Sequence, residues 1–177
     1  MDAASLQTLI STIRDVPDFP QPGILFKDIT PVLSDATLLQ RAIDGMVEIS
    51  GLSKVDKVVG IDARGFIFGA LMAQRLNAGF VPVRKKGKLP WKTHGIDYAL
   101  EYGTNHVEIH EDAIAPGETV LLADDLLATG GTAAAALHLI QGLGGKVLGS
   151  VFFVELAFLN GRDRLNDTGP VHSLITY

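Results

Sequence analysis

The sequence predicts an α/β fold in which a mostly parallel sheet is flanked by helices. Near-continuous runs of Val, Ile, Leu and Phe at residues 55–61, 119–123 and 146–154 are typical of strands buried on both faces. Between them, residues 65–76 and 133–141 have apolar side chains at helical spacing. Alternating strands and helices favour parallel pairing, which places ligands at the carboxyl ends of the strands.

Length and composition indicate a single folded domain. The chain has 177 residues, of which 47% are apolar and 20% charged, a composition far from that of disordered proteins. Its 15 basic and 20 acidic residues give a net charge of −5, which argues against nucleic-acid binding through overall charge. The absence of Cys excludes disulfides and thiol chemistry. Without a signal peptide or an apolar run near the roughly 18 residues of a membrane span, we expect a cytoplasmic protein that binds no membrane.

The N-terminal elements follow from helix and turn signals. Apolar residues recur at helical spacing over residues 6–13, and Pro17 must end that helix. Two prolines within residues 19–23 exclude a helix there, so residues 24–29 are predicted to be extended. Asp35 is suited to cap a following amphipathic helix.

The central part of the chain departs from this alternation. Residues 79–83 predict one more strand of the sheet. After it, polar residues dominate up to Gly117, with period-two stretches at residues 98–102 and 106–110. This pattern indicates a hairpin-like excursion over the edge of the sheet.

The segment from Val120 to Thr132 carries the strongest functional signal. The adjacent carboxylates Asp124 and Asp125 follow a buried strand, and Thr-Gly-Gly-Thr at residues 129–132 opens a helix. Free amides at a helix N-terminus, approached closely through glycines, bind phosphate. Neither the Gly-Lys-Ser/Thr of a triphosphate loop nor a Gly-x-Gly-x-x-Gly dinucleotide pattern is present. A carboxylate pair beside a phosphate suits vicinal hydroxyls, so ribose 5-phosphate fits both groups.

This segment resembles the phosphoribosyl-pyrophosphate motif of type I phosphoribosyltransferases. Residues 19–29, 63–66, 84–90 and 100–103 resemble the adenine phosphoribosyltransferases, in order and over nearly the whole chain. The resemblance implies a purine-salvage homodimer that converts adenine and phosphoribosyl pyrophosphate to AMP and pyrophosphate. It also implies Mg²⁺ bound mainly through the substrate's pyrophosphate, since the sequence predicts no metal site made of protein side chains.

The resemblance further implies a single domain over residues 1–177 with a type I phosphoribosyltransferase-like fold. A small N-terminal hood, residues 1–33, would bind the base. The α/β core, residues 34–177, would include a flexible lid loop at residues 84–102.

Candidate site residues come from residue chemistry and resemblance together. For ribose 5-phosphate they are Asp124, Asp125, Ala128, Thr129, Gly130, Gly131 and Thr132. For adenine they are Leu25, Phe26 and Lys27, and for pyrophosphate Arg84, Lys85 and Lys88. The candidate catalytic residues are Glu101, Arg64 and Tyr102.

Each functional interpretation has a structural alternative. Five of the 15 basic residues fall within residues 84–92, which suits a pyrophosphate but also a solvated charged loop. Arg64 could bind substrate or form an ion pair with Asp62. Glu101 could exchange a purine ring proton or be an exposed strand carboxylate. Tyr102 would help to cover the site.

Base selectivity is predicted from the backbone around Phe26. In an extended segment the Leu25 carbonyl and the Lys27 amide face the same side, where they match the N6–H donor and N1 acceptor of adenine. Hypoxanthine and guanine present the reverse pattern. Phe26 would stack on the base, although Leu25 and Phe26 also suit an ordinary core. Lys27 stands where many relatives are expected to have arginine, which leaves a role for its backbone rather than its side chain.

Two other functions remain open: transfer to another base such as xanthine or orotate, and a non-catalytic regulator that senses phosphoribosyl pyrophosphate. A regulator would need a DNA-binding module, for which the 16 residues before Pro17 leave little room.

Overall fold

The computed structural model describes residues 1–99 and 104–177 and confirms the predicted α/β class. The strands are β1 (Arg14–Pro17), β2 (Leu25–Asp28), β3 (Lys57–Ile61), β4 (Gly79–Lys85), β5 (Thr93–Ala99), β6 (Thr104–His110), β7 (Thr119–Leu127), β8 (Lys146–Glu155) and β9 (Val171–Thr176). The helices are α1 (Ala3–Thr12), α2 (Thr30–Ser34), α3 (Ala36–Ser50), α4 (Gly65–Arg75) and α5 (Gly131–Gly142), with short 3-10 helices η1 (Ala157–Leu159) and η2 (Gly161–Leu165).

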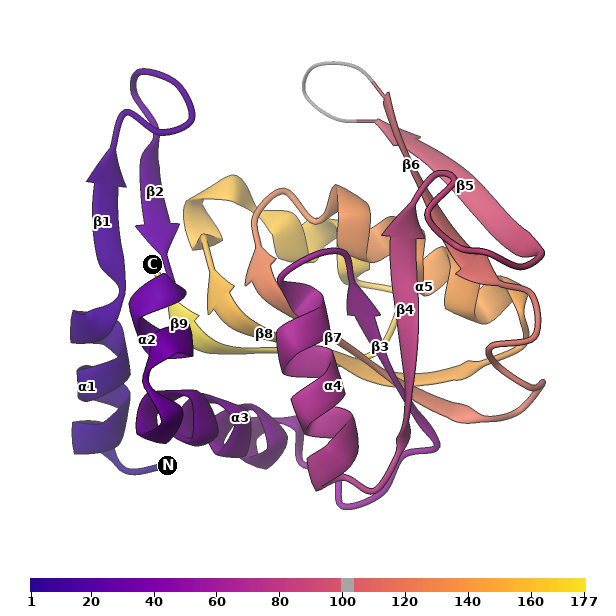
Figure 1. Cartoon of the computed structure of the whole chain (residues 1–177), viewed down its shortest axis with the longest axis horizontal. Helices are drawn as coiled ribbons and strands as arrows, with labels where there is room; N and C mark the ends of the chain where they lie inside the picture. Colours follow the sequence, from indigo (N-terminus) through magenta and orange to yellow (C-terminus); the bar gives the residue numbers. More distant parts are fainter. Residues whose placement is uncertain (100–103) are drawn as a thin grey trace.

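A central sheet has seven strands in the order β5-β6-β4-β3-β7-β8-β9 (Figure 1). The five strands from β4 to β9 in this order are parallel to their neighbours, whereas β6 is antiparallel to both β4 and β5. The carboxyl ends of the parallel strands therefore meet at one edge. The predicted excursion is the β5–β6 hairpin, but β5 begins at Thr93, earlier than the period-two pattern indicated.

The core has two halves, one on each face of the sheet. Val58 and Phe153 face the side covered by α3 and α4, where Phe153 stacks on Phe68 at 5.1 Å between ring centroids. Val59 and Phe152 face the opposite side, which α5 covers. Because successive residues of each strand are buried on alternate faces, these strands read as continuous apolar runs.

The N-terminal segment forms a separate layer beside the sheet. Helix α1 leads into the antiparallel β1–β2 hairpin, which projects on the opposite side of the carboxyl edge from the β5–β6 hairpin (Figure 1). The cap predicted at Asp35 is confirmed, since its carboxylate accepts hydrogen bonds from the amides of Thr37 and Leu38 at 2.9 Å. The sequence did not reveal β1, α2 or β9, which are short and have no long apolar pattern.

Strand β7 is longer than its apolar run predicted. It continues to Leu127 because β8 pairs with it as far as Glu155. Asp124 and Asp125 are therefore residues of the strand itself and not of a loop after it, so neighbouring strands fix their positions. None of the helices in the described part of the chain is long and apolar enough to cross a lipid bilayer.

Candidate active site

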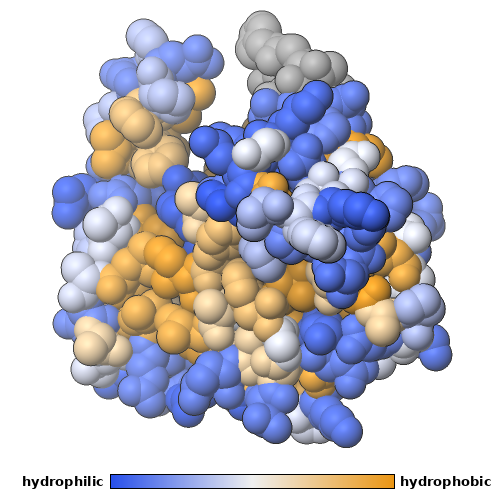
Figure 2. All heavy atoms as spheres, turned by 45° about the vertical axis from the view of Figure 1, so that its right-hand side comes forward, coloured by the Kyte–Doolittle hydropathy of each residue, from blue (hydrophilic) through white to orange (hydrophobic). Residues whose placement is uncertain are grey.

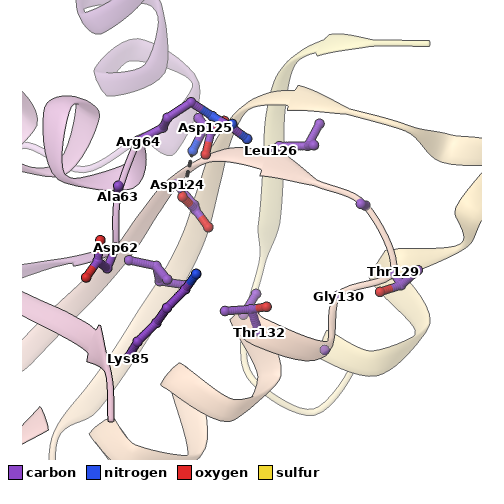
Figure 3. Close-up of a pocket in the computed structure, with 14 residues that line it drawn as sticks. Asp62, Ala63, Arg64, Lys85, Asp124, Asp125, Leu126, Thr129, Gly130 and Thr132 are labelled. Atoms are coloured by element: carbon purple, nitrogen blue, oxygen red, sulfur yellow. Dashed lines mark hydrogen bonds and ion pairs between the residues drawn. The ribbon is translucent and has the colours of Figure 1, made fainter. Parts of the chain in front are cut away.

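A cavity of about 440 Å³ lies at the carboxyl edge of the sheet (Figure 3). It is lined by Ile61, Asp62, Ala63, Arg64, Lys85, Asp124, Asp125, Leu126, Ala128, Thr129, Gly130, Gly131, Thr132 and Ala133. All seven residues predicted for ribose 5-phosphate are among them, together with Arg64 and Lys85. The cavity thus joins the ends of β3, β4 and β7 to the start of α5.

The phosphate loop, defined here as residues 128–132, ends at the N-terminus of α5. Gly130 precedes the first helical residue and has a φ of 79°, a left-handed conformation that favours glycine. The first amides of an α-helix have no partners within the helix. The helix start that the sequence predicted is therefore present, and the first amides of α5 lie beside Thr129 and Thr132.

The two aspartates have different surroundings. Asp125 is buried, and its carboxylate accepts a hydrogen bond from Arg64 Nε at 2.5 Å. The Asp124 side chain points toward the cavity, as does that of Lys85 (Figure 3). Burial and the negative charge of Asp125 raise the pKa of Asp124 well above its usual value. A side chain at Gly65 would overlap the Asp124 carboxylate, so glycine is required where α4 begins.

Arg64 connects the cavity with the N-terminal hairpin. The ion pair with Asp62 that the sequence left open does not form, because Asp62 instead accepts a hydrogen bond from Arg84 Nε at 3.1 Å. Arg64 pairs with Asp125, and its guanidinium carbon lies 5.7 Å from the centre of the Phe26 ring. It therefore lies between the predicted ribose and base sites.

The three cations predicted to bind pyrophosphate are placed differently. Lys85 lines the cavity. Arg84 does not, because its guanidinium binds Asp62 and the carbonyl of Lys88, the latter at 2.9 Å. The side chain of Lys88 also lies outside the cavity lining, and Gly87 beside it donates its amide to Glu108 at 3.0 Å. In this arrangement, Arg84 shapes the loop that carries the other cations.

The predicted adenine residues lie on β2, outside the lining of the main cavity. Phe26 contacts Phe19 edge to face at 5.1 Å, and both line a smaller hollow of about 230 Å³. The Lys27 ammonium donates to Asp15 at 2.6 Å and lies 4.0 Å from the centre of the Tyr177 ring. Its side chain is thus engaged within the protein.

The sequence did not reveal two features of the site. Asp62 lines the cavity. It follows the buried strand β3 much as Asp124 follows the apolar part of β7, and this repeated pattern could have marked Asp62 as a candidate site residue. The hydroxyl of Tyr98 accepts a hydrogen bond from Thr132 at 3.1 Å, a contact that joins β5 to the phosphate loop and has no local sequence signal. The predicted catalytic residues Glu101 and Tyr102 lie outside the described residues.

Comparisons with known proteins agree with this geometry. The phosphoribosyl transferase domain family matches residues 33–174. An adenine phosphoribosyltransferase from Mesorhizobium japonicum is 52% identical over 171 residues, which are 96% of this chain and 94% of that protein. A crystal structure of adenine phosphoribosyltransferase from Rhodothermus marinus is 53% identical, with a TM-score of 0.94 over 99% of this chain and 100% of that one.

A third relative was crystallised with ligands. The Saccharomyces cerevisiae adenine phosphoribosyltransferase, in complex with adenine and an imino-altritol bisphosphate, is 42% identical, with a TM-score of 0.91 over 98% of this chain and 99% of that one. Similarity of sequence and of fold therefore extends over almost the entire length, including the strand end and helix start that form the cavity. By these criteria the chain belongs to the phosphoribosyl transferase family and, within it, to the adenine phosphoribosyltransferases.

Proposed function

We propose that the protein transfers the 5-phosphoribosyl group of phosphoribosyl pyrophosphate to adenine, giving AMP and pyrophosphate in purine salvage. Family membership supplies the class of reaction. The observation that carries the substrate assignment is a single cavity in which a carboxylate pair on β7 lies beside the phosphate loop at the start of α5. A ribose 5-phosphate has the hydroxyls and the phosphate that these two groups can bind.

The site would hold the ribose at both ends. The amides and hydroxyls of the phosphate loop bind the 5-phosphate, helped by the positive end of the α5 dipole. Asp124 accepts hydrogen bonds from the ribose hydroxyls, while Asp125 positions Arg64 beside the reacting carbon. The ammonium group of Lys85 stabilises the negative charge that develops on the departing pyrophosphate.

In the reaction, adenine N9 forms a bond to the anomeric carbon as the bond to the pyrophosphate oxygen breaks. The electron pair of that bond leaves with pyrophosphate, and the proton lost from the purine ring passes to Glu101. Tyr102 would help to exclude water. Residues 1–33 act as the hood and residues 84–102 as the lid of a single domain, since the β1–β2 and β5–β6 hairpins project on either side of the carboxyl edge (Figure 1).

The pairing of β1 with β2 favours adenine recognition by the β2 backbone. Pro17 lies opposite Leu25 and has no amide hydrogen, so the two cannot exchange a full pair of hydrogen bonds. Bonded and non-bonded pairs alternate in antiparallel strands, which turns the backbone groups of Leu25 and Lys27 away from β1. They are then free to bind the N6 amino group and N1 of the base.

Mg²⁺ would enter with the substrate. The described residues include no group of three or more His, Asp or Glu side chains able to hold a metal ion. Mg²⁺ is commonly held by one or two carboxylates together with substrate phosphates, and Asp124 offers one carboxylate toward the cavity. The ion would offset the charge of the pyrophosphate.

We also propose that the protein is a homodimer. Apolar side chains are exposed over α4 (Figure 2), among them Ile67 and Leu71, which are 37% and 36% exposed. Leu71 borders a groove of about 360 Å³ between α3 and α4, which is also lined by Leu39 and Ile43. A contiguous apolar surface of this kind is typical of a subunit interface.

A pyrophosphate-release assay with adenine, hypoxanthine, guanine, xanthine and orotate tests this proposal. Hypoxanthine and guanine would leave the Leu25 carbonyl and the Lys27 amide without hydrogen-bond partners, at a cost of about 1–3 kcal/mol each. The value of kcat/KM for adenine should therefore exceed that for either base by about 10²-fold or more. Equal use of the purines would disprove the edge recognition. Turnover of xanthine or orotate alone would identify another transferase, and binding of phosphoribosyl pyrophosphate without turnover of any base would identify a regulator.

A further inference from the structure

The turn that joins η1 to η2 lies directly behind the phosphate loop. A Cβ atom on Gly130 would overlap the carbonyl oxygen of Gly161, and a Cβ on Gly161 would overlap the carbonyl oxygen of Ala128. The same added atom would lie 3.1 Å from the side chain of Leu127. The two backbones are therefore in direct contact, and neither glycine leaves space for a side chain.

Arg162 fixes this turn to the sheet. Its Nε and one terminal nitrogen donate to the two oxygens of Glu155 at 2.7 and 2.6 Å. Its other terminal nitrogen donates to the Val171 carbonyl at 2.6 Å, so that the guanidinium also reaches β9. A further contact to the Ser173 hydroxyl measures 3.3 Å. The planar fork of arginine suits this arrangement, which a lysine could satisfy only in part.

Glu155, the partner of Arg162, lies next to the strand that leads into the phosphate loop. It ends β8 and lies opposite Leu127, the last residue of β7 before that loop. Only 4% of it is exposed, and the hydrogen bonds from Arg162 lower the pKa of its carboxyl. A buried carboxylate is tolerated when it is paired and hydrogen-bonded, so Arg162 is held to one position.

We propose that Gly161 and Arg162 are positioning residues for the 5-phosphate. Gly161 supports the backbone of residues 128–130 from behind, and Arg162 holds Gly161 there through Glu155. Neither residue lines the cavity. The inference rests on the proposed function, because it assigns the substrate phosphate to the loop that this turn supports.

Gly161→Ala tests the contact directly. The added methyl group must displace the carbonyl of Ala128, so KM for phosphoribosyl pyrophosphate should rise about tenfold or more while KM for adenine changes less than about twofold. The affinity for ribose 5-phosphate, measured by calorimetry, should fall to a similar degree. Gly145→Ala is the matched control, because its Cβ would lie 3.0 Å from the Ile140 carbonyl at the far end of α5 and should leave both KM values unchanged.

Arg162→Lys provides a second test that keeps the charge beside Glu155. It should raise KM for phosphoribosyl pyrophosphate by about three- to tenfold. The rise should be smaller than in Arg162→Ala, because the lysine ammonium can still donate a hydrogen bond to Glu155. Arg164→Ala, at an exposed position two residues later, should behave as the wild type.

The proposal is overturned if Gly161→Ala and Arg162→Lys fold but leave phosphoribosyl pyrophosphate kinetics and ribose 5-phosphate affinity unchanged. It is also overturned if KM for adenine rises as much as KM for the phosphoribosyl substrate, which would indicate a change of the whole site and not of the phosphate loop alone. If Gly161→Ala does not fold, KM of Arg162→Lys for phosphoribosyl pyrophosphate decides whether the proposal holds. Turnover of adenine by the wild type is a separate result, so failure of the proposed function is distinguishable from failure of this inference.

Discussion

At the scale of single residues, the site depends on how a few charges are placed. Arg64 and Arg84 each bind a carboxylate at a strand end, Asp125 and Asp62 respectively. These pairs leave Asp124 and Lys85 as the charged side chains that point toward the cavity (Figure 3). Substrate binding and chemistry can therefore be tested at separate positions.

Glu101→Gln tests the proton acceptor. The amide keeps the shape of the side chain but loses its charge and its capacity to take a proton, so kcat should fall by about 10²-fold or more with little change in adenine affinity. Single-turnover kinetics isolate the chemical step from product release. Glu111→Gln, which changes an exposed carboxylate directly after β6, is the control and should leave kcat unchanged. An unchanged chemical rate would return Glu101 to the role of an exposed strand carboxylate.

Asp124→Asn should separate stability from binding. Because folding raises the pKa of Asp124, the folded state holds its proton more tightly, and the stability that this gives is lost as pH rises from about 4 through the folded-state pKa. Asparagine mimics the neutral form, so the variant should gain Tm relative to the wild type at pH 8 but not at pH 4.

The same variant should bind phosphoribosyl pyrophosphate about tenfold more weakly, since a charged acceptor for the ribose hydroxyls is lost. Adenine affinity should be unaffected. Calorimetry and thermal unfolding check both effects, with Asp167→Asn at an exposed position as the control. Unchanged affinity for phosphoribosyl pyrophosphate would show that Asp124 does not bind the diol.

Replacing the cations at the end of β4 and in the loop that follows it tests pyrophosphate binding. Lys85→Ala removes a charge-assisted contact of roughly 1.5–3 kcal/mol, so kcat/KM should fall by about one to two orders of magnitude. Lys88→Ala should have a comparable effect if its side chain reaches the pyrophosphate once substrate is bound. Lys86→Ala is the control. If Lys85→Ala and Lys86→Ala have equal kinetics, the loop is a solvated charged segment.

At the scale of elements, the proposed hood contacts Tyr177, the residue that follows β9. Lys27 on β2 lies over the ring of Tyr177 and pairs with Asp15 on β1. A partly buried cation–π contact contributes about 0.5–2 kcal/mol. This contact should hold the β2 backbone at a fixed position relative to the sheet.

Lys27→Met, which keeps the apolar stem and removes the charge, should therefore raise KM for adenine about three- to tenfold and leave KM for phosphoribosyl pyrophosphate within twofold. Steady-state kinetics with each substrate varied in turn give both values. Lys54→Met, away from the hood, serves as the control. A rise confined to the phosphoribosyl substrate would contradict the assignment of β2 to the base.

At the scale of the whole molecule, the proposed homodimer would form through the apolar surface over α3 and α4. Leu71→Asp places a charge in the middle of this surface and should convert the dimer to a monomer, since an unpaired charge is costly in an interface. Sedimentation velocity measures the change. Phe158→Asp, at an apolar side chain that is 69% exposed elsewhere, is the control and should remain dimeric. A wild-type monomer at micromolar concentration would refute the interface.

The features that are encoded locally could be predicted from the sequence. The apolar runs of β3, β7 and β8, the cap at Asp35 and the Thr-Gly-Gly-Thr turn at residues 129–132 each depend on neighbours within about one turn or one strand, because backbone geometry repeats every 2 or 3.6 residues. Its glycines and paired carboxylates also predict a ribose 5-phosphate as the ligand, which remains a prediction.

Which of these groups lie in contact depends on the long-range packing of the folded chain. Arg64 pairs with Asp125, 61 residues away, and not with the nearby Asp62, because parallel pairing of β3 with β7 brings their carboxyl ends together. The same long-range packing places Gly161 against the phosphate loop. Such contacts depend on strand register and on the path of distant turns, for which local periodicity has no signal, so they follow from the folded chain as a whole.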